Sequence, residues 1–334
     1  MLAGAGASKA VQPESYPTTV EFFERLPQPV IADQFFQFAL SFIKEQRPDE
    51  IIDIEVVLWE LQKLVEFFER INDGSSIISR AISHNVIGRV SSGWNFGQLQ
   101  NGSPRLAQDL QTTIGLVNQQ VYDLYSQDPE PAELAQNWSP LIHGLLEYGA
   151  RLDIFTTNYD LVVENALKEL NGDDFMYSYS GAAGRVQRFL DLKQWQEDAE
   201  RPGGLLTKLH GSLNWKVSGQ RIAIGDSGFT GTHAKHAIIY PGFKGRSNAT
   251  FFEPFHDYFS RMLASADHVL IVGFAFRDEY IAQILRTSLA AATKVTILNP
   301  DKSVQFPANR KVNRVVAGFD RRAVDQFITS VRAE

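Results

Sequence analysis

The chain has 334 residues, 44% of them hydrophobic, which is enough for one large α/β domain or two ordinary ones with full cores. Its net charge of −7 provides no overall basic field for nucleic acid, and no apolar run approaches the roughly 20 residues that span a bilayer. Cysteine is absent, which excludes disulfides, a thiol nucleophile and cysteine-based zinc sites. The N-terminus has no basic segment followed by a long apolar core, so we expect no signal peptide and a cytoplasmic protein.

A glycine-rich turn, Gly4-Ala5-Gly6-Ala7-Ser8, follows a very short apolar segment at residues 1–3. Glycines let a backbone approach a pyrophosphate closely, and a helix that follows offers its free N–H groups to the anion. Lys9 stands where the third glycine of G-x-G-x-x-G would be. The turn therefore fits both a nucleotide-binding loop and an ordinary glycine-rich turn.

Helical periodicity dominates the next part of the chain. Residues 17–70 alternate turn signals with apolar spacing of i, i+3, i+4, including a helix expected to open at Ile51. Residues 72–145 are rich in Gln and Asn with irregular apolar spacing, which predicts a mainly helical insertion that would serve as a lid, as an oligomer contact or as both. A small loop-rich module is expected at 171–207, and the main Rossmann-like domain then comprises 1–71 and 146–334.

Two apolar strands end in polar clusters. One ends near Phe155 and is followed by Thr156-Thr157-Asn158-Tyr159-Asp160, after which helical spacing begins at Leu161. The other covers 205–209 and delivers His210-Gly211-Ser212. Such breaks are typical of the carboxyl edge of a parallel α/β sheet, where loop side chains and helix N-termini bind ligands.

Three further strands are predicted at 237–240, 267–272 and 294–298, each ending in Gly, Pro or Asn. Between the last two, residues 279–292 read as a helix with Asp278 as its N-cap. Short apolar strands that alternate with helices predict an α/β fold, a doubly wound Rossmann-like parallel sheet.

Five segments in this order resemble the SIR2-like family, most closely the prokaryotic branch used in anti-phage defence. The resemblance spans most of the chain. The segments are Gly4-Ala5-Gly6-Ala7-Ser8, Thr156-Thr157-Asn158-Tyr159-Asp160, Lys208-Leu209-His210-Gly211-Ser212, Gly273-Phe274-Ala275-Phe276 and Leu298-Asn299-Pro300.

The resemblance implies an NAD⁺ site at the edge of the sheet. It assigns catalysis to three residues, Asn158, Asp160 and His210. It assigns contacts with the dinucleotide to eight more: Gly4, Ala5, Gly6, Ser8, Thr157, Gly273, Phe274 and Asn299. Considered one at a time, Asn158 and Asp160 also fit turn or helix-cap roles, and His210 also fits a structural hydrogen-bonding role.

The chain departs from the family in one informative way. Protein-deacylating members carry a four-cysteine zinc module, which a chain without cysteine cannot build. We therefore expect no metal site and no deacylation, but hydrolysis of NAD⁺, as substrate, to nicotinamide and ADP-ribose without any further cofactor. Cyclisation, ADP-ribosyl transfer to a protein, and non-catalytic sensing of NAD⁺ or ADP-ribose are the alternatives.

An enzyme that depletes NAD⁺ must be held inactive in healthy cells. The resemblance therefore implies a homo-oligomer, or a separate partner such as an ATPase or an Argonaute-like protein, that gates the activity. Neither a membrane nor direct nucleic-acid binding is expected.

Overall fold

The computed structural model describes residues 1–49, 51–72, 103–147, 151–169, 176–177, 188–189, 195, 204–218, 221–225, 236–238 and 246–332. The chain divides into two compact units, Met1–Thr18 with Tyr122–Glu334, and Thr19–Val121. These limits differ from those predicted for an insertion at 72–145. Residues 73–102 and most of 171–207 lie outside the described residues, so the predicted domain boundaries stay a prediction.

The unit Thr19–Val121 is helical where it is described. It holds α2 (Thr19–Glu24), α3 (Gln28–Ile31), α4 (Gln34–Gln46), α5 (Ile54–Asn72) and most of α7 (Ser103–Tyr125). The helix predicted from Ile51 begins three residues later, at Ile54. The cause is Asp53, whose carboxylate accepts the N–H groups of Glu55 and Val56 at 3.0 and 3.1 Å and so fixes the helix start.

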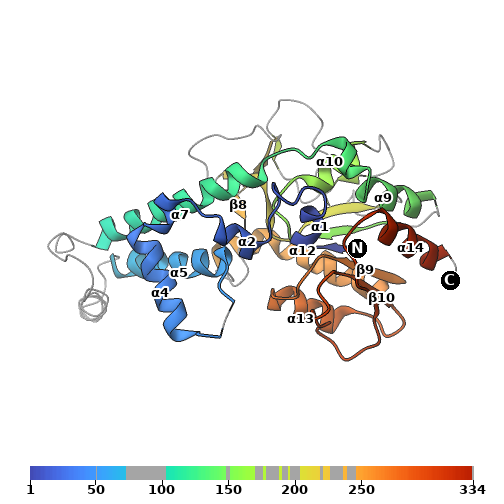
Figure 1. The fold of residues 1–334 in the computed structure, drawn as a ribbon. Coiled ribbons are helices and arrows are strands. Elements are labelled where there is room, and N and C mark those ends of the chain that lie inside the picture. Colours follow the sequence, from blue (N-terminus) through green and yellow to red (C-terminus); the bar gives the residue numbers. More distant parts are fainter. Residues whose placement is uncertain are drawn as a thin grey trace. The chain divides into compact units, whose positions relative to one another are not determined.

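The other unit is built on a seven-stranded sheet in which every pairing is parallel, with the order β11-β10-β9-β1-β2-β5-β3 (Figure 1). This confirms the predicted doubly wound, Rossmann-like α/β fold. The strands are β1 (Leu2–Ala3), β2 (Ile154–Thr156), β3 (Met176–Tyr177), β5 (Leu205–Lys208), β9 (His268–Val272), β10 (Lys294–Leu298) and β11 (Asn313–Val315).

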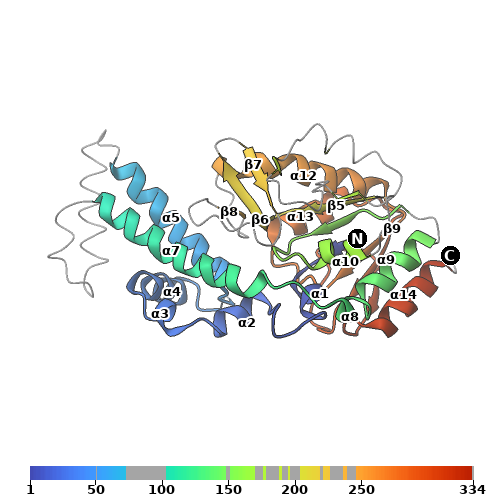
Figure 2. The ribbon, with the colours of Figure 1, turned by 90° about the horizontal axis from the view of Figure 1, so that it is seen from above.

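Helices cover both faces of this sheet (Figure 2). Successive strand residues enter opposite cores, as for Ile154 and Phe155 or Leu205 and Leu206, because side chains alternate along a strand. One core includes residues of α8 (Pro131–Leu134), α9 (Trp138–Glu147), α10 (Val162–Glu169) and α14 (Arg321–Arg332). The other includes residues of α12 (Arg246–Ser265) and α13 (Glu279–Ser288). None of the described helices is long and apolar enough to cross a membrane.

A second, four-stranded sheet has the order β4-β7-β6-β8, with β4 (Arg188–Phe189), β6 (Gly211–Ser218), β7 (Arg221–Ile224) and β8 (His236–Ile238). Placing the strand predicted at 237–240 in the parallel sheet was wrong, because β8 pairs antiparallel with β6. Parallel neighbours need a long crossover, usually a helix, whereas the described residues between β6 and β8 form another strand, β7.

The helix α13 has the predicted N-cap and a different end. The Asp278 carboxylate accepts the N–H groups of the first turn, as expected. The helix stops at Ser288 rather than at residue 292, because Leu289 adopts an extended conformation. The guanidinium of Arg310 then donates to carbonyl oxygens of the chain that leaves the helix, including Ala290 at 3.1 Å.

Candidate functional site

The carboxyl ends of five parallel strands form one row across the sheet. Thr156 pairs with Ala3 on one side and with Lys208 on the other. Ala3 also pairs with Val272, which in turn pairs with Leu298. Each of the five is the last residue of its strand, and neighbouring strands lie about 4.8 Å apart. Whatever follows them in the chain therefore starts from the same edge.

The residues predicted for the site lie just beyond this row, except Ala5, Gly6 and Ser8, which lie on the helix α1 (Ala5–Lys9). Asn158 and His210 stand two positions beyond the paired residues Thr156 and Lys208. The other segments are placed alike: Gly4 follows β1, Thr157 follows β2, Gly273 and Phe274 follow β9, and Asn299 follows β10. The structure thus brings the predicted segments to one edge, and the role assigned to each residue stays a prediction.

The glycine turn packs directly against the loop after β9. The N–H groups of Gly4 and Gly6 donate to Val272 O and Gly273 O at 2.9 and 3.0 Å. A Cβ on Gly4 would lie 2.8 Å from Gly273 O, and Gly273 itself has a φ of +59°. These glycines are needed for the close approach of two main chains. The helix α1 (Ala5–Lys9) starts within the segment predicted as a turn, directly after Gly4.

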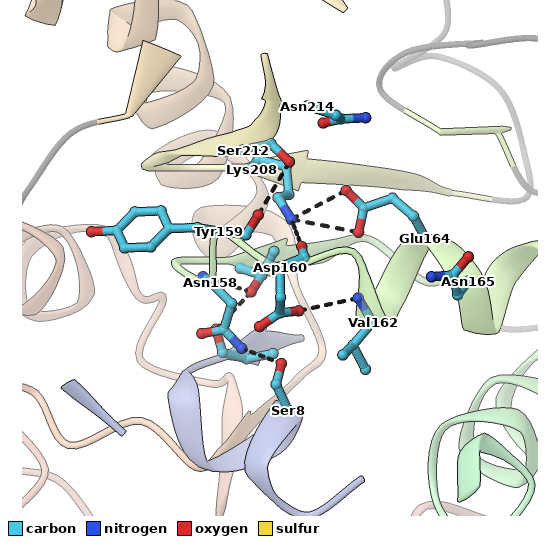
Figure 3. A network of polar contacts seen from close by, with 12 residues as sticks. Ser8, Asn158, Tyr159, Asp160, Val162, Glu164, Asn165, Lys208, Ser212 and Asn214 are labelled. Atoms are coloured by element: carbon cyan, nitrogen blue, oxygen red, sulfur yellow. Dashed lines mark hydrogen bonds and ion pairs between the residues drawn. The ribbon is translucent and has the colours of Figure 1, made fainter. Parts of the chain in front are cut away.

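Asn158 links the loop after β2 to the glycine turn. Its buried Nδ2 donates to Gly4 O at 2.9 Å and to Ser8 Oγ at 2.8 Å (Figure 3). Its Oδ1 is also buried and has no hydrogen-bond partner among the described residues. Because buried polar atoms are nearly always partnered, this oxygen is an acceptor open to a group from outside the described residues.

Asp160 caps a helix, and burial disfavours the ionised form of its carboxyl group. Its Oδ1 accepts the Val162 N–H at 3.1 Å, which fixes the start of α10. Burial raises the pKa of the Asp160 carboxyl, although the charge of Lys208 and the Ser8 hydroxyl act in the opposite direction. The cap role and a role in the site are therefore compatible at this residue.

Beside Asp160 lies a buried ion pair that the sequence did not single out. The Lys208 side chain is 1% exposed, and its Nζ lies 3.1 Å from Glu164 Oε1. The same Nζ donates to the main-chain oxygen of Asp160. Burial raises the pKa of the Glu164 carboxyl, and the Lys208 charge opposes this shift. A lysine that ends an otherwise apolar strand was the available signal.

His210, two residues beyond the end of β5, is held by Asp278, the N-cap residue of α13. His210 Nε2 lies 2.7 Å from Asp278 Oδ2, and both side chains are less than one-tenth exposed. The other oxygen of Asp278 accepts the Tyr280 and Ile281 N–H groups at 2.8 and 3.1 Å. Burial acts to raise the pKa of Asp278, but His210 and these N–H groups outweigh it, so the pKa is lowered.

Asp278 was predicted only as a helix cap. Its contact with His210 joins residues 68 positions apart, and no local pattern could reveal it. Because Asp278 occupies Nε2, Nδ1 is the nitrogen of His210 without a partner among the described residues. A carboxylate on one imidazole nitrogen fixes the ring orientation and makes the other nitrogen the proton acceptor.

The remaining predicted residues mostly make hydrogen bonds that hold their loops in place. Thr157 N–H donates to Ala3 O at 3.2 Å. The Asn299 side chain spans its own loop, since Oδ1 accepts the Asp301 N–H at 2.9 Å and Nδ2 approaches Phe274 O at 3.4 Å. Within the described part of the chain, no group of three or more His, Cys, Asp or Glu side chains is placed to hold a metal ion.

Residues 153–312 match a family model described as a SIR2-like domain, just under half of the chain. This stretch includes Asn158, Lys208, His210 and Asp278, and it supports the predicted resemblance at the level of the SIR2-like domain. A search of curated proteins finds no match.

Several solved structures are similar in fold. A Sir2 homologue in complex with NAD is 13% identical, with 99% of this chain and 88% of that chain covered and a TM-score of 0.41. A mutant Sir2 homologue in complex with 2′-O-acetyl ADP ribose is 13% identical, with 99% and 90% covered and a TM-score of 0.43.

Proposed function

We propose that the protein is an NAD⁺ hydrolase that cleaves the bond between nicotinamide and ribose and releases ADP-ribose. One observation carries this proposal. Asn158, whose buried oxygen has no partner in the described part of the chain, and His210, oriented by Asp278, follow the paired ends of two adjacent strands. A simple dinucleotide-binding module needs neither a free acceptor nor an oriented imidazole at that edge.

The reaction makes modest demands on acid catalysis, because nicotinamide leaves a cationic glycoside as a neutral molecule. The protein must hold the ribose, stabilise positive charge at its anomeric carbon and position a water. In this proposal Asn158 Oδ1 accepts from a ribose hydroxyl or from that water. The buried Asp160 carboxylate offsets positive charge or accepts from the carboxamide, and the backbone of residues 4–8 approaches the diphosphate.

His210 is the general base of the proposed step. The water oxygen bonds to the anomeric carbon, the bond from that carbon to nicotinamide breaks, and the proton from water passes to His210 Nδ1. Asp278 stabilises the imidazolium through Nε2 until the proton returns to solvent. NAD⁺ and water are consumed, and nicotinamide, ADP-ribose and one proton are produced.

The proposal extends to a cellular role. The resemblance to the anti-phage branch supports an effector that depletes NAD⁺ when infection is sensed, gated by self-assembly or by a separate partner such as an ATPase or an Argonaute-like protein. This role is tested by measuring NAD⁺ in cells that carry the wild-type chain or His210→Ala, before and after phage infection. A fall of NAD⁺ only with the wild-type chain and only after infection is expected.

The activity is tested with the purified chain and NAD⁺, with the products followed by chromatography. Removing a general base or a positioned polar group costs about 10²–10⁴ in rate, so His210→Ala and Asn158→Ala should release nicotinamide about 10³-fold more slowly. NAD⁺ affinity, measured by calorimetry, should change far less. A cyclic product would favour cyclisation. Binding without turnover would leave two readings, a gated enzyme or a sensing module, which the NAD⁺ measurement in infected cells separates. Neither binding nor turnover would refute the site.

A further inference from the structure

The proposed reaction makes no use of the most deeply buried charge at the site. The Lys208 ammonium is enclosed at the end of β5, with the Glu164 carboxylate on one side and the Asp160 carbonyl oxygen on the other (Figure 3). Its Nζ lies 3.1 Å from Glu164 Oε1 and 3.5 Å from Oε2. It therefore connects three elements: β5, the loop after β2 and the first turn of α10.

These contacts belong to a longer series in which the segment 208–213 holds carbonyl oxygens at the end of β2 and in the loop that follows. Leu209 N–H donates to Thr156 O at 2.8 Å, Leu213 N–H donates to Tyr159 O at 3.0 Å, and Lys208 Nζ donates to Asp160 O. The Ser212 hydroxyl also donates to Tyr159 O, at 3.3 Å, so Lys208 provides the one charged contact of the series. Asn158 lies within the loop that is held in this way, and His210 lies within the segment that holds it.

Stability alone gives a poor account of this ion pair. Removing two charges from water costs several kcal/mol each, and replacing a buried pair with apolar residues of similar size is often neutral or stabilising. A methionine would fill the space of Lys208, but it could not donate to the Asp160 carbonyl. What lysine provides here, and methionine cannot, is thus a hydrogen bond to the loop that carries Asn158 and Asp160.

We propose that Lys208 is a positioning residue, with the partly buried Glu164 as its counter-ion, that fixes the loop carrying Asn158 and Asp160 relative to the strand end carrying His210. Its effect on turnover rests on the proposed hydrolase function. Its effect on the loop does not.

The main test is the double variant Lys208→Met with Glu164→Gln, which removes both charges of the pair. Lys63→Met with Glu66→Gln removes a surface pair of the same kind and is the matched control. Hydrogen–deuterium exchange should rise in peptides that cover 157–162 in the site variant only. A misplacement of about 1 Å can cost 10²-fold, so kcat should fall about 10- to 100-fold while the NAD⁺ dissociation constant changes little.

The outcomes are separable. Wild-type exchange and wild-type kcat in the folded double variant would overturn the proposal, because a merely structural pair would affect stability alone. If the wild-type chain alone does not cleave NAD⁺, kcat gives no reading, and exchange of the 157–162 amides still decides whether Lys208 holds the loop.

A second route covers failure of the double variant to fold. The chain has no cysteine, so Lys208→Cys introduces a single thiol. Alkylating it in denaturant with 2-bromoethylamine restores an ammonium at the length of lysine, whereas methylation gives a neutral side chain. After refolding beside the wild-type chain, slow exchange of the 157–162 amides should return only with the ammonium. Equal protection with the neutral adduct would overturn the proposal.

Discussion

The two ends of strand β2 carry polar groups of opposite character. At the amino end, Asp153 bonds Arg151 Nε at 2.8 Å and the Tyr258 hydroxyl at 2.8 Å, and Arg151 also donates to that hydroxyl at 3.0 Å. Each member of this group is bonded to the others. At the carboxyl end, Asn158 Oδ1 is buried without a partner among the described residues, and Asp160 carries a raised pKa.

This difference separates groups that stabilise the fold from groups that are prepared for a ligand. A closed network satisfies its own donors and acceptors and contributes to the free energy of unfolding. A buried acceptor without a donor, and a buried carboxylate that resists ionisation, both reduce that free energy until a ligand completes them. Such a cost is common at functional sites and uncommon elsewhere.

Of the variants that test this difference between the two ends of β2, Asp278→Asn is expected to change NAD⁺ cleavage most. The asparagine oxygen can keep the helix cap, which leaves its NH₂ group facing His210 Nε2 and forces the proton of the neutral imidazole onto Nδ1. The general base is then in the wrong tautomer, and NAD⁺ cleavage should fall at least about 10²-fold. Steady-state rates and the melting temperature would be measured together.

The control for this variant is Asp33→Asn, which alters the N-cap of α4 in the helical unit. Asp33 accepts the N–H groups of Phe35 and Phe36, as Asp278 does for its own helix, but no described contact joins it to the site. Both variants should melt within a few degrees of the wild-type protein. Equal loss of cleavage in both would show that capping, and not the contact with His210, matters.

Much of this architecture was predictable from local patterns. Apolar runs that end at Thr156, Val272 and Leu298 identified strands and their order in the chain, because burial on both faces of a parallel sheet gives continuous hydrophobic segments. The same reasoning misplaced β8, because an apolar strand of three residues has the same composition in either kind of sheet.

Local patterns predicted only some of the site residues. Asn158 and His210 follow strands directly, so the sheet edge predicts that they lie near one another. Asp278 and Glu164 act through contacts with His210 and Lys208 that depend on how helices dock on the sheet. Docking is decided by packing over long sequence separations, so no spacing within the chain encodes these pairs.

A smaller effect is expected from Asp160→Asn. Burial raises the pKa of Asp160 above the ordinary value of about 3.9, so the folded state resists a charge that the unfolded chain accepts. The ionisable carboxyl therefore lowers the free energy of unfolding as the pH rises above about 4. The variant should melt a few degrees higher than wild type at pH 7, and this difference should disappear below pH 4. Cleavage should fall about 10-fold.

Thermal melting from pH 3 to pH 8 tests whether Asp160→Asn melts above the wild-type protein at pH 7 and together with it below pH 4. Glu164 also has a raised pKa, mainly from burial and in part from the Asp160 charge, so the difference between the two proteins reports Asp160 together with its effect on Glu164. A variant less stable than wild type at every pH would mean that the carboxylate is satisfied in the folded protein. The carboxyl end of β2 would then be as closed as the amino end.

The smallest effect is expected at the amino end, from Tyr258→Phe. The ring keeps its packing against Phe155, but the hydroxyl bonds to Asp153 and Arg151 are lost. Because the two partners still bond each other, the free energy of unfolding should fall by only about 1 kcal/mol. NAD⁺ cleavage should not change, since this network lies at the opposite end of β2 from Asn158. Urea unfolding measures the first quantity and product chromatography the second. A variant of normal stability with reduced cleavage would mean that the closed network acts on the site through β2, and the division of this strand into a stabilising end and a ligand-binding end would no longer hold.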